Sequence, residues 1–381
     1  MQKKFLALAV AGALAPAAAM AQSTVEIYGR ANLGIDTYSA TGSTADTGNF
    51  KSRARVFDSS SRVGFRVNES LGGGMRAFVV VETGVNIDSG SQNGQAGVGG
   101  VNGSSGFWAS RSSYLGLGGG WGDIRFGRQD VFYGNGIIQQ AAANYINTAV
   151  DGIWTQLGNG ISAPGGRLSN VLSYNSPTMG GFNASVYWSP NSEGSNYTGA
   201  GQSKDSVWAL TARYSGGPLR AQFDILKRDN VGFVSDNEDL GWKIGVGWAY
   251  APDSQISVVT GKIENERVGA DNDPEIRITT FNWEHMLGQW QLIAQYMVTS
   301  DIKNIAVTDN TATKGYTLAA KYFMSKRTGV YASFSQYKNE SNAFADFGPG
   351  ACLSSGPACH LAAGSAGADP RIIALGIMHN F

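Results

Sequence analysis

The side chains best suited to acid–base chemistry in this chain are its three histidines. His285 lies beside a tight turn, His360 follows a cysteine in a polar loop, and His379 lies in the last strand-like segment. Nucleophilic catalysis needs a hydroxyl or thiol within hydrogen-bonding distance of a base that a third group orients. None of the three histidines lies in a motif with serine and aspartate. The sequence therefore argues against a protease or a lipase and predicts no catalytic residues.

Arginine is the second chemical group that the sequence places in a pattern. Arg30 in VEIYGRANLGIDTY lies opposite an apolar face, and so do Arg62 and Arg66 in SRVGFRV. A guanidinium group stays charged at every physiological pH and pairs readily with anions. Arginines on the polar face of a half-apolar strand predict a surface that attracts anions, provided that this face meets water.

The composition indicates β-structure. Charged residues are 15% of the 381 residues, against roughly 25% in ordinary soluble domains. Glycine occurs 52 times and aromatic residues make up 11%. Glycine without a collagen period, together with many aromatic residues, is typical of twisted strands and tight turns. One all-β domain can accommodate this length, so several domains are not required.

The first residues predict a secretory signal peptide. Lys3 and Lys4 precede an apolar stretch from 5 to 15, Pro16 interrupts it, and residues 19–21 form an A-x-A cleavage site. We expect a signal peptide at 1–21 and a mature domain at 22–381. Without the two signal lysines, 27 basic residues face 29 acidic ones, and this net charge of −2 argues against a nucleic-acid partner. No later run reaches the roughly 18 apolar residues of a membrane-spanning helix.

The only cysteines are Cys352 and Cys359, seven residues apart in a long polar loop. In an oxidising exported compartment we expect them to form a disulfide; two free thiols are the alternative. His360 adds a third metal-binding side chain, but no fourth ligand is close in sequence. We therefore predict neither a metal site nor a cofactor.

The dominant pattern of the mature chain is alternation with period two. In its first segment Val25, Ile27, Leu33 and Ile35 share one face of a strand, while Glu26, Arg30 and Asn32 share the other. The pattern runs for about a dozen residues, enough for a tilted strand to cross a bilayer. It recurs around 61–67, 240–250 and 288–298, and the last segment, RIIALGIMHNF, ends on an aromatic residue, Phe381.

Short turns and long loops alternate between these segments. Seven tight turns fall at 69–74, 117–122, 176–181, 215–218, 251–254, 286–289 and 324–328. Eight long polar loops fall near 39–51, 88–106, 131–166, 190–205, 229–239, 265–274, 301–312 and 339–369. An up-and-down barrel with both termini on one side has one turn fewer than it has loops. The count therefore predicts an all-β, 16-stranded antiparallel transmembrane barrel, with both termini on the periplasmic side.

Six motifs spread in order along the mature chain resemble those of one family. They are VEIYGRANLG, SSRVGFRVNESLGGGMRA, RSSYLGLGGGWGDIRFGRQ, GRLSNVLSYNSP, KYFMSKRTGVYASFSQYKN and LGIMHNF. Together they resemble the trimeric general-diffusion porins of Gram-negative bacteria, and most closely the β-proteobacterial branch. The resemblance implies a 16-stranded barrel whose third loop, about 131–166 here, folds inward and narrows the pore.

The resemblance also implies which residues line the constriction. The wall positions that match the family's motifs are Arg30 in YGR, Arg62 in SRVGF, Arg111 in RSSYLGL, Arg167 in GRLSN and the carboxylate Glu82 in VVVETG. Alternation supports Arg30 and Arg62, whereas Arg111 would share a face with Leu115 and Leu117. Ordinary solvated barrel arginines are the alternative reading. Arg66 and Arg128 are expected to be secondary pore-lining residues, and Arg125 to lie near a rim or a subunit contact.

The third loop departs from the pattern of the family. It lacks the Pro-Glu-Phe-Gly turn of the enterobacterial members, and Asp151 is its only charged residue. Four wall arginines then face only Glu82 and Asp151. Since a ring with excess arginine favours anions, we expect a preference for anions.

These observations predict an outer-membrane channel for passive diffusion of ions and small hydrophilic solutes. The resemblance implies a homotrimer; outer-membrane lipid and lipopolysaccharide are the other expected partners. A substrate-specific channel for small anions or organic acids is the main alternative, because the same barrel would serve it. Surface loops could also give the protein a role as an adhesin, which the sequence does not address.

Overall fold

The structure, a computed structural model, describes residues 23–45, 48–88, 108–132, 150–155, 165–190, 205–231, 236–267, 273–306, 308–347 and 366–381. The predicted signal peptide at 1–21 and both cysteines lie outside the described residues. The cleavage site and the disulfide therefore stay predictions. Within the described ranges, no helix has the length and apolar character needed to cross a membrane.

The described residues form seventeen β-strand segments and one short 3-10 helix. The strands are β1 (Thr24–Thr41), β2 (Phe50–Asp58), β3 (Arg62–Gly72), β4 (Met75–Gly84), β5 (Ser113–Gly119), β6 (Gly122–Val131), β7 (Gly166–Asn175), β8 (Phe182–Ser189), β9 (Ser206–Gly216), β10 (Leu219–Asp229), β11 (Glu238–Ala251), β12 (Ser254–Glu266), β13 (Glu275–Leu287), β14 (Trp290–Thr299), β15 (Thr313–Phe323), β16 (Thr328–Asn339) and β17 (Asp369–Asn380). The helix is η2 (Val150–Thr155). All strand pairs are antiparallel and belong to one sheet.

Two of these segments are halves of one wall strand. The first half of β1 pairs with β3 and its second half pairs with β2. Between β2 and β3 the backbone breaks at Ser60, whose φ of 61° lies in the left-handed region. The described part of the chain therefore builds a barrel wall of sixteen strands, and the strand number predicted from the turns and loops is confirmed.

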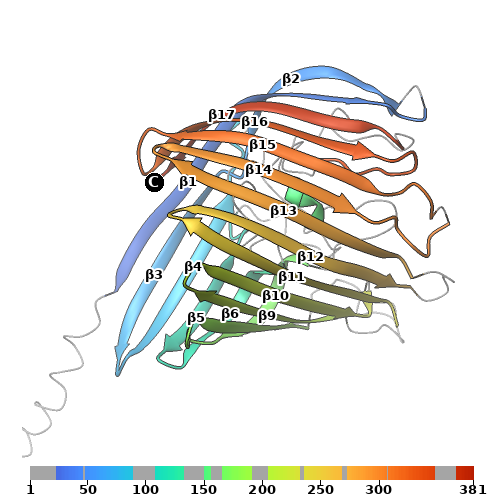
Figure 1. Cartoon of the computed structure of the whole chain (residues 1–381). Coiled ribbons are helices and arrows are strands. Elements are labelled where there is room, and N and C mark those ends of the chain that lie inside the picture. Colours follow the sequence, from blue (N-terminus) through green and yellow to red (C-terminus); the bar gives the residue numbers. More distant parts are fainter. Residues whose placement is uncertain are drawn as a thin grey trace, which may run out of the picture.

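The barrel closes where β17 meets β1 (Figure 1). The amide of Gly29 donates to the carbonyl oxygen of Phe381 at 3.0 Å, and the amide of Phe381 donates back at 3.1 Å. A Cβ at Gly29 would lie 2.3 Å from the Phe381 ring, so only glycine fits beside this ring. The last residue of the chain therefore contributes directly to the seam.

The two ends of the barrel differ. All seven predicted tight turns join consecutive strands at one end, which also holds the start of β1 and the end of β17 (Figure 1). The strand ends that border the eight predicted long connections lie at the opposite end. This asymmetry, with the start of β1 and the end of β17 on the side of the short turns, is that of outer-membrane barrels.

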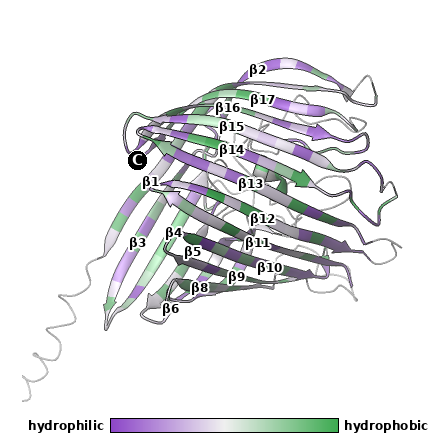
Figure 2. Ribbon diagram, viewed as in Figure 1, coloured by the Kyte–Doolittle hydropathy of each residue, from purple (hydrophilic) through white to green (hydrophobic). Residues whose placement is uncertain are grey.

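Hydrophobic and hydrophilic residues alternate along many of the strands (Figure 2), and their exposure alternates with them. Outward positions carry exposed apolar residues such as Ile27, which is 63% exposed, and Trp248. Inward positions carry buried polar residues such as Asn32, Asn282 and Thr317. This is the reverse of a soluble protein, and it suits a wall that separates lipid from an inner aqueous space.

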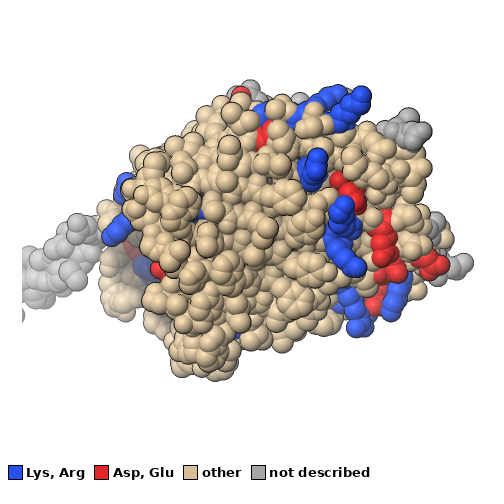
Figure 3. Space-filling view, turned by 45° about the horizontal axis from the view of Figure 1, so that its top comes forward, with Lys and Arg blue, Asp and Glu red and all other residues tan. Residues whose placement is uncertain are grey.

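The outer surface carries a broad band without charges, which gives way to charged residues toward the loop end (Figure 3). Charged residues near the loop ends of the strands pair across strands, for example Lys338 with Asp369 at 2.7 Å and Lys227 with Glu238 at 2.9 Å. Charges beyond the ends of an apolar band are expected where a barrel wall leaves the hydrocarbon layer.

Aromatic residues gather on the outer surface beside the tight turns. His285 stacks between Tyr250 and Trp283, with ring centres 6.0 and 5.8 Å away. Trp290 packs against Tyr322 with ring centres 5.0 Å apart. An aromatic girdle at the membrane boundary is a feature of transmembrane barrels. His285 therefore has a structural place in this girdle.

Candidate functional site

One carboxylate bridges two arginines on the lumen wall where β3 and β4 meet. The Nε of Arg111 lies 2.6 Å from one oxygen of Glu82, and the Nε of Arg62 lies 3.6 Å from the other. Arg30 is in register with Arg62 across β1 and β3, and its Nε donates to the neutral amide oxygen of Asn380 at 3.0 Å. Arg62 and Arg111 thus share the Glu82 carboxylate, and Arg30 lies beside Arg62.

Arg111 reaches this cluster because the regular alternation of β5 begins only at Ser113. Leu115 and Leu117 face outward, and strict alternation would have turned Arg111 outward as well. Instead the backbone amide of Arg111 donates to the carbonyl oxygen of Glu82 at 3.0 Å. The side chain then lies beside the Glu82 carboxylate. Arg111 therefore faces the lumen although Leu115 and Leu117 face outward.

Arg167 joins the cluster through a carboxylate that sequence reasoning missed. It pairs with Asp130, directly opposite in register on β6, at 2.8 Å. The hydroxyl of Ser112 also donates to Asp130, at 3.0 Å. Arg62 is within electrostatic reach of Arg167, as it is of Arg30 and Arg111. The four predicted wall arginines therefore lie in one electrostatic neighbourhood; Asp130 in the motif GRQD was the available signal.

Arg125 lies on the lumen side of β6, where the sequence had placed Arg128. It pairs in register with Gly116, which lies between the outward Leu115 and Leu117. Its guanidinium carbon is 5.1 Å from the centre of the Tyr114 ring. An inward side chain does not suit a subunit contact, whereas a position near the rim stays a prediction, since Arg125 lies close to the tight turn between β5 and β6.

Arg128 lies at a β-bulge of β6, where the pairing register with β7 shifts between Gly127 and Gln129. Simple alternation from Arg125 therefore does not fix its side, and it lies within electrostatic reach of Arg167 and Asp130. The Nε of Arg128 donates to the carbonyl oxygen of Ser110, and its Nη1 donates to the hydroxyl of Ser169 at 2.7 Å. The expectation that Arg128 is a secondary pore-lining residue stays a prediction.

The other two predicted positions stand apart from the cluster. Arg66 shares the lumen face with Arg62 but lies four residues nearer the tight-turn end, where it pairs with Glu26 at 2.8 Å. Asp151 belongs to η2, and its side chain lies outside the described part of the chain.

Two lysines on the inner wall were not predicted as site residues. Lys321 on β15 is buried, lies within electrostatic reach of Arg30, and places its ammonium 4.5 Å from the centre of the Phe323 ring. Lys243 on β11 is equally deep. A signal for Lys243 was present, because it stands on the polar side of the alternating segment LGWKIGVGWAY.

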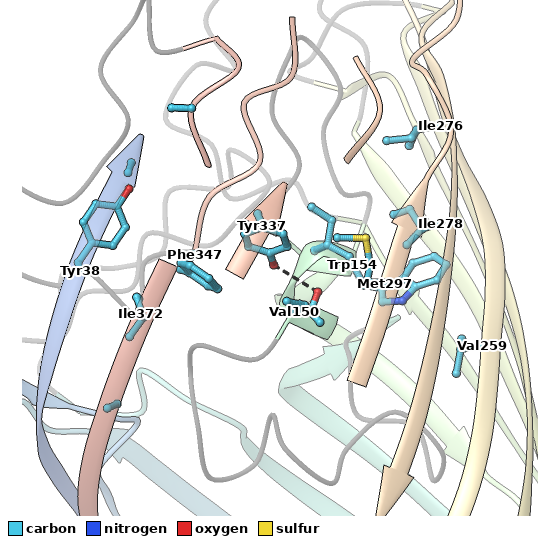
Figure 4. Close-up of a cluster of buried hydrophobic side chains, with 14 of the residues drawn as sticks. Tyr38, Val150, Trp154, Val259, Ile276, Ile278, Met297, Tyr337, Phe347 and Ile372 are labelled. Carbon is cyan, nitrogen blue, oxygen red and sulfur yellow. Dashed lines mark hydrogen bonds between the residues drawn. The ribbon is translucent and has the colours of Figure 1, made fainter. Parts of the chain in front are cut away.

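The helix η2 lies against the inner face of the opposite wall. The amide of Val150 donates to the hydroxyl of Thr317 at 3.1 Å, and the hydroxyl of Tyr337 donates to the carbonyl oxygen of Val150 at 3.2 Å (Figure 4). Ile153 and Trp154 are buried in the same place. We call this the η2 cluster; its described members include Val150, Ile153, Trp154, Val259, Ile263, Ile276, Ile278, Met297, Tyr337, Phe347 and Ile372.

The arrangement attracts and orders ions rather than activating a nucleophile. The guanidinium groups bear fixed positive charge, and they hydrogen-bond to carboxylates and neutral oxygens. No group of three or more His, Cys, Asp or Glu side chains that could hold a metal ion occurs among the residues that the structure describes. Charged side chains at close quarters in a lumen select passing solutes by sign.

A closed sixteen-stranded wall with an apolar exterior and a charged, polar interior defines a membrane-spanning barrel with an aqueous channel. The family described as Gram-negative porin matches residues 7–342, and the chain belongs to that family. It is therefore a porin of the Gram-negative outer membrane, through which ions and small hydrophilic solutes diffuse passively. Its family and fold are those of a channel rather than of an enzyme.

Two curated relatives illustrate this membership. Outer membrane porin protein 32 of Delftia acidovorans is 26% identical over 358 residues, which cover 89% of this chain and 90% of the relative. Major outer membrane protein P.IB of Neisseria gonorrhoeae is 30% identical over 236 residues, or 59% of this chain and 61% of the relative.

Two solved structures share the fold. The anion-selective porin from Comamonas acidovorans superposes with a TM-score of 0.68 at 20% identity, covering 94% of this chain and all of the other. The trimer form of OmpT from Vibrio cholerae, folded in vitro, gives a TM-score of 0.58 at 13% identity, covering 94% and 99%.

Proposed function

We propose that this porin prefers anions and that Arg30, Arg62, Arg111 and Arg167 set the preference at its narrowest point. The observation that carries the proposal is the bridge at Glu82, where one carboxylate serves both Arg62 and Arg111. Among the described residues, the four arginines share two carboxylates, Glu82 and Asp130, so the cluster retains excess positive charge. A solute that passes within a few ångströms meets that charge almost unscreened, because the Debye length is about 8 Å at physiological salt.

We further infer that the 131–166 segment runs through the lumen and narrows it, with Asp151 as its single charge. The contacts of Val150 with Thr317 and Tyr337 support this path, because both partners lie on the inner wall. The name of the structural relative from Comamonas, an anion-selective porin, agrees with the sign of the proposed preference.

The zero-current potential across a tenfold chloride gradient tests the proposal. A sign that reports chloride as the more permeant ion is expected in the wild type, and the potential should weaken as total salt rises. A cation sign would contradict it. The substrate-specific alternative differs in one respect: a single solute would then block the ion current in a saturable way, whereas a general channel gives current proportional to concentration.

We also infer a homotrimer, embedded in outer-membrane lipid and lipopolysaccharide, with a signal peptide at 1–21, a barrel domain at 22–381 and no catalytic activity. The trimer is supported by the trimeric form of a structural relative, and the apolar outer band supplies surface for subunits and lipid alike. The mass of the native complex in detergent, together with the N-terminal sequence of the mature protein, tests these inferences.

A further inference from the structure

Lys243 is a buried cation on the lumen wall that the arginine cluster does not include. Only 2% of the residue is exposed. It lies on β11 in register with Gly261 of β12. A Cβ at Gly261 would lie 2.7 Å from the Cα of Lys243. The neighbouring strand thus makes room for the lysine, whose ammonium reaches inward rather than toward the end of the barrel.

The ammonium of Lys243 contacts two separate parts of the 131–166 segment. Its Nζ donates to the carbonyl oxygen of Phe132 at 3.3 Å and lies 4.6 Å from the centre of the Phe132 ring. The same Nζ lies 5.8 Å from the centre of the Trp154 ring in η2. Phe132 directly follows β6, so one cation meets both the beginning of the segment and its helix.

The charge of Lys243 is balanced on the wall itself. Asp224 of β10 places a carboxylate oxygen 3.8 Å from the ammonium. Thr211 and Gln222 each donate a hydrogen bond of 2.6 Å to Asp224. A carboxylate held by neutral donors fixes the position of its cation. The ammonium is therefore oriented toward Phe132 and Trp154 and is electrostatically compensated by Asp224.

We propose that Lys243 is the positioning residue of the constriction segment, clamping Phe132 and Trp154 to one point of the wall. The inference rests on the proposed function, because it assumes that the 131–166 segment narrows the lumen. A cation holds two aromatic faces and a carbonyl together more strongly in a desolvated site than in water. Its role is to keep the segment in one place, and the arginines then act on solutes at a fixed distance.

Lys243→Met and Lys321→Met form a matched pair for the test. Each removes one buried ammonium from the lumen wall and keeps a stem of similar size, and Lys321 contacts Met378 and Phe323 of the wall. In the full-length protein in lipid bilayers, hydrogen exchange of peptides that cover 150–155 should accelerate roughly tenfold or more in Lys243→Met. Exchange in Lys321→Met should stay at the wild-type rate.

Single-channel recordings give the second readout. Lys243→Met should show increased open-channel current noise and closures at lower voltage, because a loosened segment samples several positions. Lys243→Arg, which keeps the cation, should restore wild-type exchange and quiet current. Equal exchange and equal noise in Lys243→Met and Lys321→Met would overturn the inference.

If Lys243→Met does not fold, Trp154→Leu and Asp224→Asn replace it. Trp154→Leu removes one aromatic face and leaves the lysine, and Asp224→Asn removes the countercharge that orients it. Both should accelerate exchange at 150–155, and unchanged exchange in both overturns the inference. The wild-type zero-current potential decides the proposed anion preference separately, so the two failures are distinguishable.

Discussion

On the side of the lumen where β1, β3 and β4 meet, guanidinium groups stand close together with one carboxylate between them. On the side formed by β12 to β16, the inner face is apolar where η2 packs on it, and Ile263 and Ile278 have no exposed surface at all. The first region keeps like charges together although they repel. The second stabilises its contacts by removing apolar surface from water. The arginines, whose charge acts on solutes, thus lie on one wall of the barrel. The apolar residues that hold η2 in place lie on another.

The largest expected effect comes from the apolar wall. Trp154 is 1% exposed, and replacing a buried tryptophan with alanine costs about 3–5 kcal/mol of packing free energy. Trp154→Ala should release η2, which hydrogen exchange at 150–155 would report as lost protection. Trp208→Ala, on the outward face, is the control and should leave that protection unchanged. Retained protection in Trp154→Ala would show that packing does not hold the helix.

The next prediction concerns which side of the wall is apolar. Phe65 pairs in register with the exposed Ile27 and so faces outward. Phe65→Arg should lower the free energy of unfolding by roughly 2–4 kcal/mol if the position lies near the bilayer centre. Urea titration of the protein folded into vesicles measures it, with Arg66→Gln on the opposite face as the control. Equal stability of both variants would refute the inside–outside assignment of β3.

The next prediction tests the arginine cluster with substitutions that remove the charge of the side chain but keep much of its size. The double variant Arg62→Gln, Arg111→Gln should lower the anion-to-cation permeability ratio by about tenfold, which corresponds to about 1.4 kcal/mol. The zero-current potential in a chloride gradient measures the ratio. Arg277→Gln, which removes an exposed charge at the outer rim, should leave it nearly unchanged. An unaltered potential in the double variant would place the selective residues elsewhere.

The smallest effect is expected where charges are exposed. Lys338 and Asp369 pair at 2.7 Å near the loop end, with the lysine side chain half exposed. Solvent-exposed pairs contribute about 0–1 kcal/mol. Lys338→Gln should therefore change neither the unfolding midpoint in urea nor the zero-current potential measurably. A clear shift in either would mean that the rim takes part in selection or stability after all.

Strand number and turn positions were predictable because both depend on short stretches of sequence. Period-two alternation identifies a strand, and clusters such as LGGGWG at 117–122 identify a turn. The family motifs named Arg30 and Arg62, and the same alternation supported both. Arg125 and Arg128 were harder to place, because the pairing register of β6 with β7 shifts between them. A bulge of this kind is not visible in a single segment.

The η2 cluster could not be predicted from the sequence. Val150 contacts Thr317 and Tyr337, which lie 167 and 187 residues further along the chain. The cluster also needs apolar residues on the inner face, and alternation alone assigns that face to polar side chains. The apolar side chains of Ile263 and Ile278 on the inner face are therefore explained only by the η2 cluster to which they belong. For Lys243, the alternation of its strand already indicates that the side chain faces the lumen. Its contacts with Phe132 and Trp154 could not be predicted in this way.

The seam between β1 and β17 has a consequence for how the molecule is made. Phe381 directly follows β17, and it exchanges two backbone hydrogen bonds with Gly29, close to the start of the barrel. Until β17 is in place, β1 keeps an open edge that pairs readily with another molecule. Closure of the barrel is thus coupled to the arrival of β17, and a chain that stopped before Phe381 would lose contacts at this final joint.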